Sequence, residues 1–422
     1  MTPWRVPMTT QWTTPSALGR RLQRARVGHW FAGNQGDPYA LILRALRDDP
    51  SPYEEEVRAR GPVFHSEALD TWVVTDGALA RSVLTDARFG ALTRAGGRYR
   101  AELLPPAGAE LGPDPAGDER GGVPAGADPA VSARDEAAVE ALAERVSHTL
   151  LGGLGTDFDL VTDFARRLSA QVLAEFLGMP AADRDRFEEL LTGCARSLDS
   201  RLCPQTLDIT RTGLEAAAGL RELLGRHLDD GGERSARAAL ALAVGAAEPA
   251  GVLICNAFEM LGDSHGPWDA LCRNPEKAGA VVEETWWRRP PVRLESRIAQ
   301  EDVELAGAVV PADGHVAILV AAAQRDPAIA PARAQDGPTG GPERGDGTGV
   351  PLGLLGDAHS TSAARTAGAI SRAALRVLAR EAPGLRPSGA VVRLRRAPVT
   401  LGHARFPVTR TGSGALTGPA TA

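Results

Sequence analysis

The sequence predicts a mainly α-helical fold with small antiparallel β-sheets, which is the α+β class. Two observations lead to this class. Segments with apolar residues at helical spacing occupy most of the chain, and short β-type segments are confined to three regions near residues 62–75, 296–321 and 390–408. No internal repeat is visible, which excludes a repeat architecture. With 422 residues, the chain is long enough for one large domain or for several ordinary ones.

The clearest helix is expected in residues 158–180, where four apolar residues recur at helical spacing: Val161, Phe164, Leu168 and Val172. Gly178 and Pro180 then supply a stop signal. The same periodicity predicts further helices over residues 37–48, 134–151, 183–198, 209–229, 236–262, 275–288 and 362–381.

Strands are expected where short β-branched or alternating segments lie between turn signals. In chain order these segments are PVFHS, TWVVT, SRIA, VELAG, HVAILVA, AVVRLRR and HARFPV. Their small number agrees with minor sheets beside a helical body.

Four segments are too rich in Pro, Gly and small polar residues to predict regular structure. Residues 1–16 and 411–422 are expected to be disordered ends, and residues 105–130 and 331–349 are expected to be flexible surface loops. Residues 17–410 remain as the predicted folded domain.

The composition is that of a soluble globular protein, with 43% apolar and 24% charged residues. A formal net charge of -6 offers no basic field for nucleic acid or anionic lipid. The four cysteines have no metal-ligand spacing and are too sparse for a disulfide scaffold, so they indicate buried thiols in a reducing compartment. The N-terminus lacks the apolar core of a signal peptide, and we expect a cytoplasmic protein.

One run, residues 238–261, is long enough to span a bilayer. Glu248, Pro249, Asn256 and Glu259 interrupt it, and each would need a partner inside hydrocarbon. We therefore expect a long helix through the middle of a soluble protein and no membrane association.

From about residue 36 to 408, the order of elements resembles the cytochrome P450 family of haem-thiolate monooxygenases. The most specific stretch is residues 289–327, in which Arg297 stands where the family has an arginine that reaches a haem propionate. In the same stretch Ala-Gln-Arg-Asp-Pro replaces the family's Ala-Asn-Arg-Asp-Pro. Residues 158–187 resemble the D and E helix region, and residues 383–408 resemble the C-terminal sheet. The resemblance implies a single large domain.

The axial haem ligand of that family is a cysteine thiolate in a loop just before the L helix. Counting back without gaps from Pro383 places Thr361 at this position, and a threonine hydroxyl is not a comparable ligand. Shifting the alignment by a few residues does not bring a cysteine to this position, because the last cysteine in the chain is Cys272. His359 is either a replacement imidazole ligand or, as we favour, a surface or capping residue near a helix start.

Two further positions of the family pattern are altered. The oxygen-activating acid and threonine of the I helix correspond to Glu248 and Pro249, so the acid is kept and the hydroxyl is lost. On the K helix the family has Glu-x-x-Arg, and here Glu284 is followed by Trp287 at the arginine position. Arg288 is one residue, or about 100°, further around the helix, so we expect it not to restore the same ion pair with Glu284.

Other haem contacts are also missing or reassigned. The Pro/Gly/Ala-rich residues 105–130 take the place of the C-helix segment that holds the propionates. Without haem, Arg297 is expected to pair with a carboxylate such as Glu295 or Asp302. Trp286 and Trp287 either fill part of the porphyrin volume or divide between core and surface. Together these changes predict a scaffold that binds no haem or other cofactor.

The N-terminal run from Leu18 to Tyr39 resembles the opening of a small branch of P450-like auxiliary proteins. Members of that branch pair with glycosyltransferases that attach TDP-activated deoxyaminosugars to macrolide and anthracycline polyketides in actinobacteria. The resemblance implies a non-catalytic activator that forms a hetero-oligomer with its glycosyltransferase. Trp30, Phe31 and Tyr39 are candidate partner contacts, and the alternative is that they cover the core.

Two other functions stay open at this point. One is a haem-dependent monooxygenase with a non-cysteine axial ligand, which would be coloured when purified. The other is a carrier that binds a polyketide aglycone in the old substrate cavity.

Overall fold

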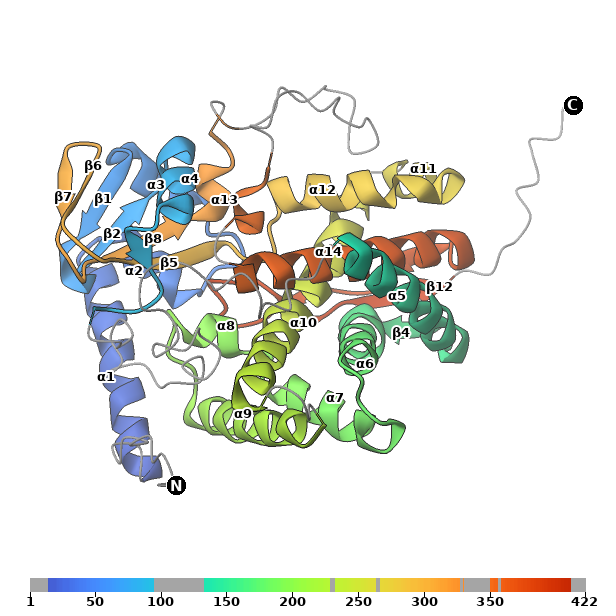
Figure 1. Cartoon of the computed structure of the whole chain (residues 1–422). Coiled ribbons are helices and arrows are strands. Elements are labelled where there is room, and N and C mark those ends of the chain that lie inside the picture. The colour runs from blue at the N-terminus through green and yellow to red at the C-terminus, as the bar shows by residue number, and fades with distance from the viewer. Residues whose placement is uncertain are drawn as a thin grey trace, which may run out of the picture.

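The computed structural model describes residues 14–94, 133–227, 232–262, 266–326, 329, 350–355 and 358–410. The loops expected at 105–130 and 331–349 and the expected C-terminal tail lie outside these residues, as does most of the expected N-terminal tail. The first helix begins at Pro15, inside the segment 1–16. Figure 1 shows a helical body beside a smaller β-region that carries α3, α4 and α13.

The described helices confirm the helical class, and the expected helices all have counterparts. They are α1 Pro15–Asn34, α2 Pro38–Arg44, α3 Ser51–Ala59, α4 Gly77–Thr85, α5 Ala133–Gly153, α6 Arg166–Phe176, α7 Arg184–Gly193, α8 Ser197–Ser200, α9 Leu207–His227, α10 Gly232–Gly262, α11 Pro267–Arg273, α12 Ala278–Arg288, α13 Val320–Ala323 and α14 Ala358–Glu381. A π-helical turn, Leu160–Ala165, leads into α6. Helices α1, α3, α4, α11 and α13 were not expected, and the first two residues of α13 were expected to be strand.

The strands form small sheets, as expected. They are β1 Val63–Ser66, β2 Thr71–Val74, β3 Phe89–Gly90, β4 Asp157–Asp159, β5 Leu294–Ala299, β6 Val303–Leu305, β7 Ala308–Val310, β8 His315–Leu319, β9 Leu385–Pro387, β10 Val392–Arg393, β11 His403–Arg405 and β12 Pro407–Arg410. The largest sheet has the order β1-β2-β8-β5-β3. Its β2–β8 pair is parallel, in contrast to the antiparallel pairing expected throughout.

Local sequence explains how the N-terminal helices begin. Thr14 caps α1 by accepting a hydrogen bond from the Ala17 amide, and Pro15 occupies the first turn. Asp37 caps α2 in the same way, accepting from the Ala40 amide at 3.0 Å. These caps fix the corner at which α1 and α2 meet.

The main core surrounds α10, which passes through the helical body (Figure 1). It is the one helix in the described part of the chain that is long and apolar enough to cross a membrane, and 72% of its most apolar window is buried. Leu240, Leu253, Ile254 and Leu261 on α10 are fully enclosed. The helix is therefore a core element of the fold, as the sequence predicts.

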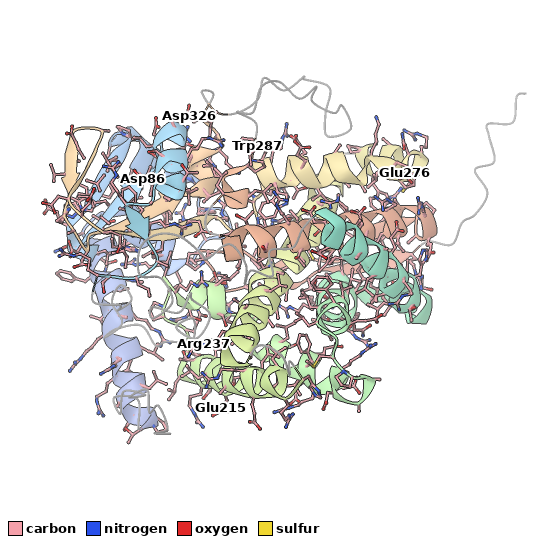
Figure 2. The ribbon with its side chains drawn as sticks, in the orientation of Figure 1. Asp86, Glu215, Arg237, Glu276, Trp287 and Asp326 are labelled. Atoms are coloured by element: carbon pink, nitrogen blue, oxygen red, sulfur yellow. The ribbon has the colours of Figure 1, made fainter. Side chains whose placement is uncertain are left out.

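An ion-pair ladder joins α14 to α5. It consists of Arg365, Arg372, Arg376 and Arg380 on α14 and Glu136, Glu140 and Glu144 on α5. Arg376 lies at its centre, 2.7 Å from Glu140 and 2.6 Å from Glu144. Glu276, labelled in Figure 2, extends the ladder toward α12 through Arg380. The repeated spacing of four residues keeps each charge on the facing side of its helix.

Candidate functional site

The residues that correspond to the family's haem site lie on α10 and α14. Glu248 and Pro249 occupy the middle of α10, and Thr361 lies in the first turns of α14. The two helices cross next to one another in the helical body (Figure 1). The sequence-based alignment therefore places the corresponding residues on adjacent elements.

At this crossing α10 and α14 are in direct contact. A Cβ atom added to Gly245 would lie 3.1 Å from the Cβ of Ala363, two residues after Thr361. Further along, the Ser371 hydroxyl lies 3.4 Å from the Ala250 carbonyl oxygen. A flat ring placed between two surfaces needs a van der Waals contact on each face, or about 7 Å in total. The spacing at Gly245 and Ala363 does not accommodate a porphyrin.

The thiols of the chain do not supply an axial ligand here. Cys255 is buried on α10, Cys194 and Cys203 are buried elsewhere, and Cys272 lies on α11. Burial raises the pKa of Cys203 to about 12 and that of Cys272 to about 11, so both stay protonated at neutral pH. Thr361 is partly buried, and the His359 side chain lies outside the described part. The donor set does not fit haem-thiolate ligation.

Glu248 is a buried carboxyl group in the middle of α10. Within the described residues it forms no hydrogen bond or ion pair, and its Oε1 approaches the backbone at Gly402. Burial raises its pKa to about 7, although Arg166 nearby acts in the opposite direction. The next residue, Pro249, is also buried and removes a backbone donor from the helix. An acid remains at this point without the relay hydroxyl.

Two small cavities border Glu248, and Arg166 lines both of them. One, of about 20 Å³, lies between α6, α7 and α10, and the other, of about 10 Å³, reaches Val161 and His403. Volumes of this size hold about one water molecule each. They are far below the several hundred Å³ of a typical small-molecule site.

On the K helix a contact with Glu284 forms, but the family's buried ion pair is not restored. Arg288 does pair with Glu284, with 2.5 Å between Arg288 Nε and Glu284 Oε1. The two residues are four apart, which brings side chains together along one face of a helix, so the 100° offset from Trp287 did not prevent contact. The Arg288 side chain is 61% exposed, and the pair therefore lies at the surface. It is not a buried ion pair.

Both tryptophans of the K-helix segment are buried, so the division between core and surface is wrong. Trp286 packs in the main core, where its ring lies close to Gly353. Trp287, labelled in Figure 2 at the end of α12 that faces the β-region, belongs to a second core with Leu352 and Val316. Two large indoles therefore occupy interior volume between α12 and the segment that precedes α14.

Gln324 connects these parts and was not singled out from the sequence. Its side-chain amide donates to the carbonyl oxygens of Trp286 at 2.8 Å and Trp287 at 3.0 Å. Its side-chain oxygen accepts from the Leu352 amide at 2.8 Å. Gln324 is the second residue of the Ala-Gln-Arg-Asp-Pro segment that resembles the family pattern. That segment therefore has a structural role, because it fixes the end of α12 to the chain before α14.

Arg297 on β5 pairs with Glu295 at 3.2 Å, as expected. It also donates to the Ser296 carbonyl oxygen at 2.9 Å. Asp302, the other carboxylate considered, instead accepts from the Ala312 amide. In the family the arginine at this position reaches a haem propionate. In this chain Arg297 pairs instead with Glu295 on its own strand.

The candidate partner contacts separate into two kinds. Trp30 and Phe31 on α1 are 59% and 56% exposed. Tyr39 is 1% exposed and packs in a core with Ile42, so it is not a surface residue, and this part of the expectation is wrong. Tyr39 occupies the second position of α2, whose inner face is buried. Sequence alone gives no direction for a side chain so close to a helix start.

Another buried site was missed at the sequence level. Glu54 on α3 lies 2.6 Å from Arg293 and 2.9 Å from Arg325. Burial would raise the pKa of Glu54, but the two arginines together lower it. Arg325 follows Gln324, so the same segment contributes to both connections.

The chain is similar in sequence to known proteins of one family. No family model matches the chain. Protein TylM3 from Streptomyces fradiae is 45% identical, over 93% of this chain and 93% of TylM3. The cytochrome P450 family protein EryCII from Saccharopolyspora erythraea is 33% identical, over 95% of this chain and 99% of EryCII.

Solved structures agree with this assignment. The ligand-free crystal structure of CYP164A2 from Mycobacterium smegmatis superposes with a TM-score of 0.69 at 26% identity. The match covers 88% of this chain and 99% of CYP164A2. The chain belongs to the cytochrome P450 family, in the branch of P450-like auxiliary proteins that includes TylM3.

Proposed function

We propose that this protein is a non-catalytic activator of a glycosyltransferase that transfers a TDP-deoxysugar to a polyketide in antibiotic biosynthesis. In this proposal it acts in the cytoplasm, binds no haem and forms a hetero-oligomer with the enzyme. Its membership of the auxiliary branch supports the partner class. The observation that carries the non-catalytic role is the contact of Gly245 with Ala363, beside a threonine at the ligand position.

The activator works through binding equilibrium. A partner that binds only the native form of an enzyme stabilises it by RT ln(1 + [L]/Kd), or about 2.7 kcal/mol at a hundredfold excess over Kd. Domains are stable by only about 5–15 kcal/mol, so this contribution keeps a marginal enzyme folded. The activator needs no reactive group for this effect.

The test uses a TDP-deoxysugar glycosyltransferase of antibiotic biosynthesis from the same organism, produced alone and together with the chain. We expect coexpression to give a complex in size-exclusion chromatography and to raise both the activity and the melting temperature of the enzyme. A matched control coexpresses a catalytic P450 of the same fold, which should give neither effect. An enzyme equally active and stable alone would contradict the proposal.

A second prediction addresses haem. We expect the wild-type protein and Thr361→Cys, both produced with added haem precursor, to be colourless and to give no carbon monoxide difference band. Restoring the thiol leaves the contact between α10 and α14 unchanged, so no space opens for the ring. A Soret band in the wild type would support an atypical axial ligand, and a band only in Thr361→Cys would show that the cysteine alone is missing.

A further inference from the structure

The inner and outer faces of helix α1 carry residues at the same helical spacing, but the side chains differ in chemistry. Leu18, Leu22, Ala25, His29 and Ala32 face inward and are buried. On the outer face, the same spacing produces a set that we call the aromatic stripe: Arg20, Arg24, Val27 and Phe31, with Trp30 beside them. The outer face of a surface helix is normally polar.

The apolar members of the stripe are well exposed to solvent. Val27 is 63% exposed, Trp30 59% and Phe31 56%, and they lie at i, i+3 and i+4 on one helix. Single exposed apolar residues are common, but a contiguous group with two aromatic rings is typical of an interaction surface. Figure 1 shows α1 at one edge of the molecule, away from the crossing of α10 and α14.

An arginine lies over one face of the Trp30 indole. The Arg44 guanidinium lies over its ring, with its central carbon 6.0 Å from the ring centroid. Arg44 is itself held, because it donates to the His29 carbonyl oxygen at 3.1 Å and to Asn34 Oδ1 at 3.0 Å. It rests on Gly33, where a Cβ atom would lie 2.8 Å from the guanidinium carbon. An aromatic ring ordered before binding loses little conformational freedom on association.

The positive charge of α1 indicates which charge the partner's surface carries. Helix α1 carries four arginines and no acidic residue, in a chain whose net charge is -6: Arg20, Arg21, Arg24 and Arg26. Arg26 turns inward and donates to the backbone at Gln205. Arg20 and Arg24 are exposed, and neither forms an ion pair within the described part of the chain. Two exposed guanidinium groups, N-terminal to the aromatic rings on the outer face of the same helix, complement a surface that bears carboxylates.

We propose that the aromatic stripe is the docking surface for the partner enzyme. It rests on the proposed function, since the partner is the glycosyltransferase that the protein activates. The complementary surface on that enzyme is an apolar pocket that receives Trp30 and Phe31 and is edged by Asp or Glu side chains that face Arg20 and Arg24.

The test measures binding of the glycosyltransferase used above to the whole chain by titration calorimetry. We expect the double variant Trp30→Ser/Phe31→Ser to bind at least about 30-fold more weakly, because truncation of buried aromatic anchors has effects of this size. Val309→Ser is the matched control. Val309 is a 60% exposed apolar residue on β7, and its replacement should leave the affinity unchanged.

A second variant tests the charges. Arg20→Glu/Arg24→Glu should weaken binding and reverse the dependence on salt, so that added salt improves the affinity in place of reducing it. Circular dichroism should show the wild-type fold and melting temperature for every variant, since all the altered side chains are exposed.

The outcomes separate the two proposals. Wild-type affinity in the Trp30→Ser/Phe31→Ser variant would overturn the docking surface and leave the activator function intact. No complex with the wild-type chain would overturn both. Two other occupants of the aromatic stripe would also overturn the proposal. A second copy of the chain would appear as a doubled molecular mass that the Trp30→Ser/Phe31→Ser variant loses. Residues 1–13 would appear as quenching of Trp30 fluorescence by a soluble quencher that is seen only after these residues are removed.

Discussion

Replacing Glu54 with glutamine should lower the free energy of unfolding by about 3–5 kcal/mol, the range measured when one partner of a buried ion pair is removed. Glu54 is the shared carboxylate of Arg293 and Arg325. Its loss leaves the Arg293 guanidinium, which is 11% exposed, without this countercharge and leaves Arg325 paired only with the exposed Glu55. Urea unfolding at pH 7, followed by circular dichroism, measures the change.

The neighbouring residue provides the control for this prediction. Glu55 also pairs with Arg325, at 3.0 Å, but its side chain is 54% exposed. Glu55→Gln should therefore change the free energy of unfolding by less than about 1 kcal/mol. Equal effects of the two substitutions would contradict the importance of burial. Because the folded-state pKa of Glu54 is lowered, its contribution is present above the unfolded pKa of a glutamate and is lost as the pH falls through the folded pKa.

Replacing Glu248 with glutamine should instead raise the free energy of unfolding at neutral pH. Its pKa is about 7 in the folded state, against 4.5 for the ordinary group. A raised folded pKa favours folding only while the group is protonated, so the wild type loses stability as the pH rises from about 4.5 to about 7. A shift of this size corresponds to at most about 3 kcal/mol. The Glu248→Gln variant cannot ionise at this position, so it should keep the stability that the wild type loses as the pH rises.

The free energy of unfolding of wild type and Glu248→Gln, measured by urea at intervals from pH 4 to pH 8, tests the sign. The two curves should meet near pH 4, diverge between about pH 4.5 and pH 7, and stay apart above pH 7, with the variant higher. Glu259→Gln is the contrasting control. Arg393, Arg289 and His403 surround Glu259 and hold its pKa at about 2 against the effect of burial, so its loss should destabilise at neutral pH. Parallel curves for Glu248→Gln would show that this carboxyl group is not desolvated.

Local patterns predicted the helices that are long and periodic. The apolar spacing around Val161 and Leu168 gave the α6 region, and the interrupted run around Glu248 gave a buried helix rather than a membrane span. Helices α3 and α4 have nine residues each, which is too few for a clear period. The twenty-residue α1 is different, since it was missed although its buried residues recur at helical spacing. The parallel β2–β8 pair joins segments more than two hundred residues apart, and no local signal fixes the direction of such a pair.

The assignment of Thr361, Glu248 and Trp287 to the family's haem-site positions stays a prediction. The pairing of Arg297 with Glu295 is confirmed and needed only neighbours on one strand. The Glu54–Arg325 pair spans 271 positions, so the partner of either residue could not be found from sequence spacing. Tyr39 shows the same limit at short range, because the burial of one side of α2 depends on the surface packed against it.

The close approach of Gly245 and Ala363 bears on how such a protein could change over generations. A single codon change would return a cysteine to position 361 yet leave the backbones of α10 and α14 where they are. To receive a porphyrin at this point, both helices and Trp286 would have to shift together. On the proposed function, oxidative chemistry would therefore need several mutations at once, and selection would act on what the molecule binds.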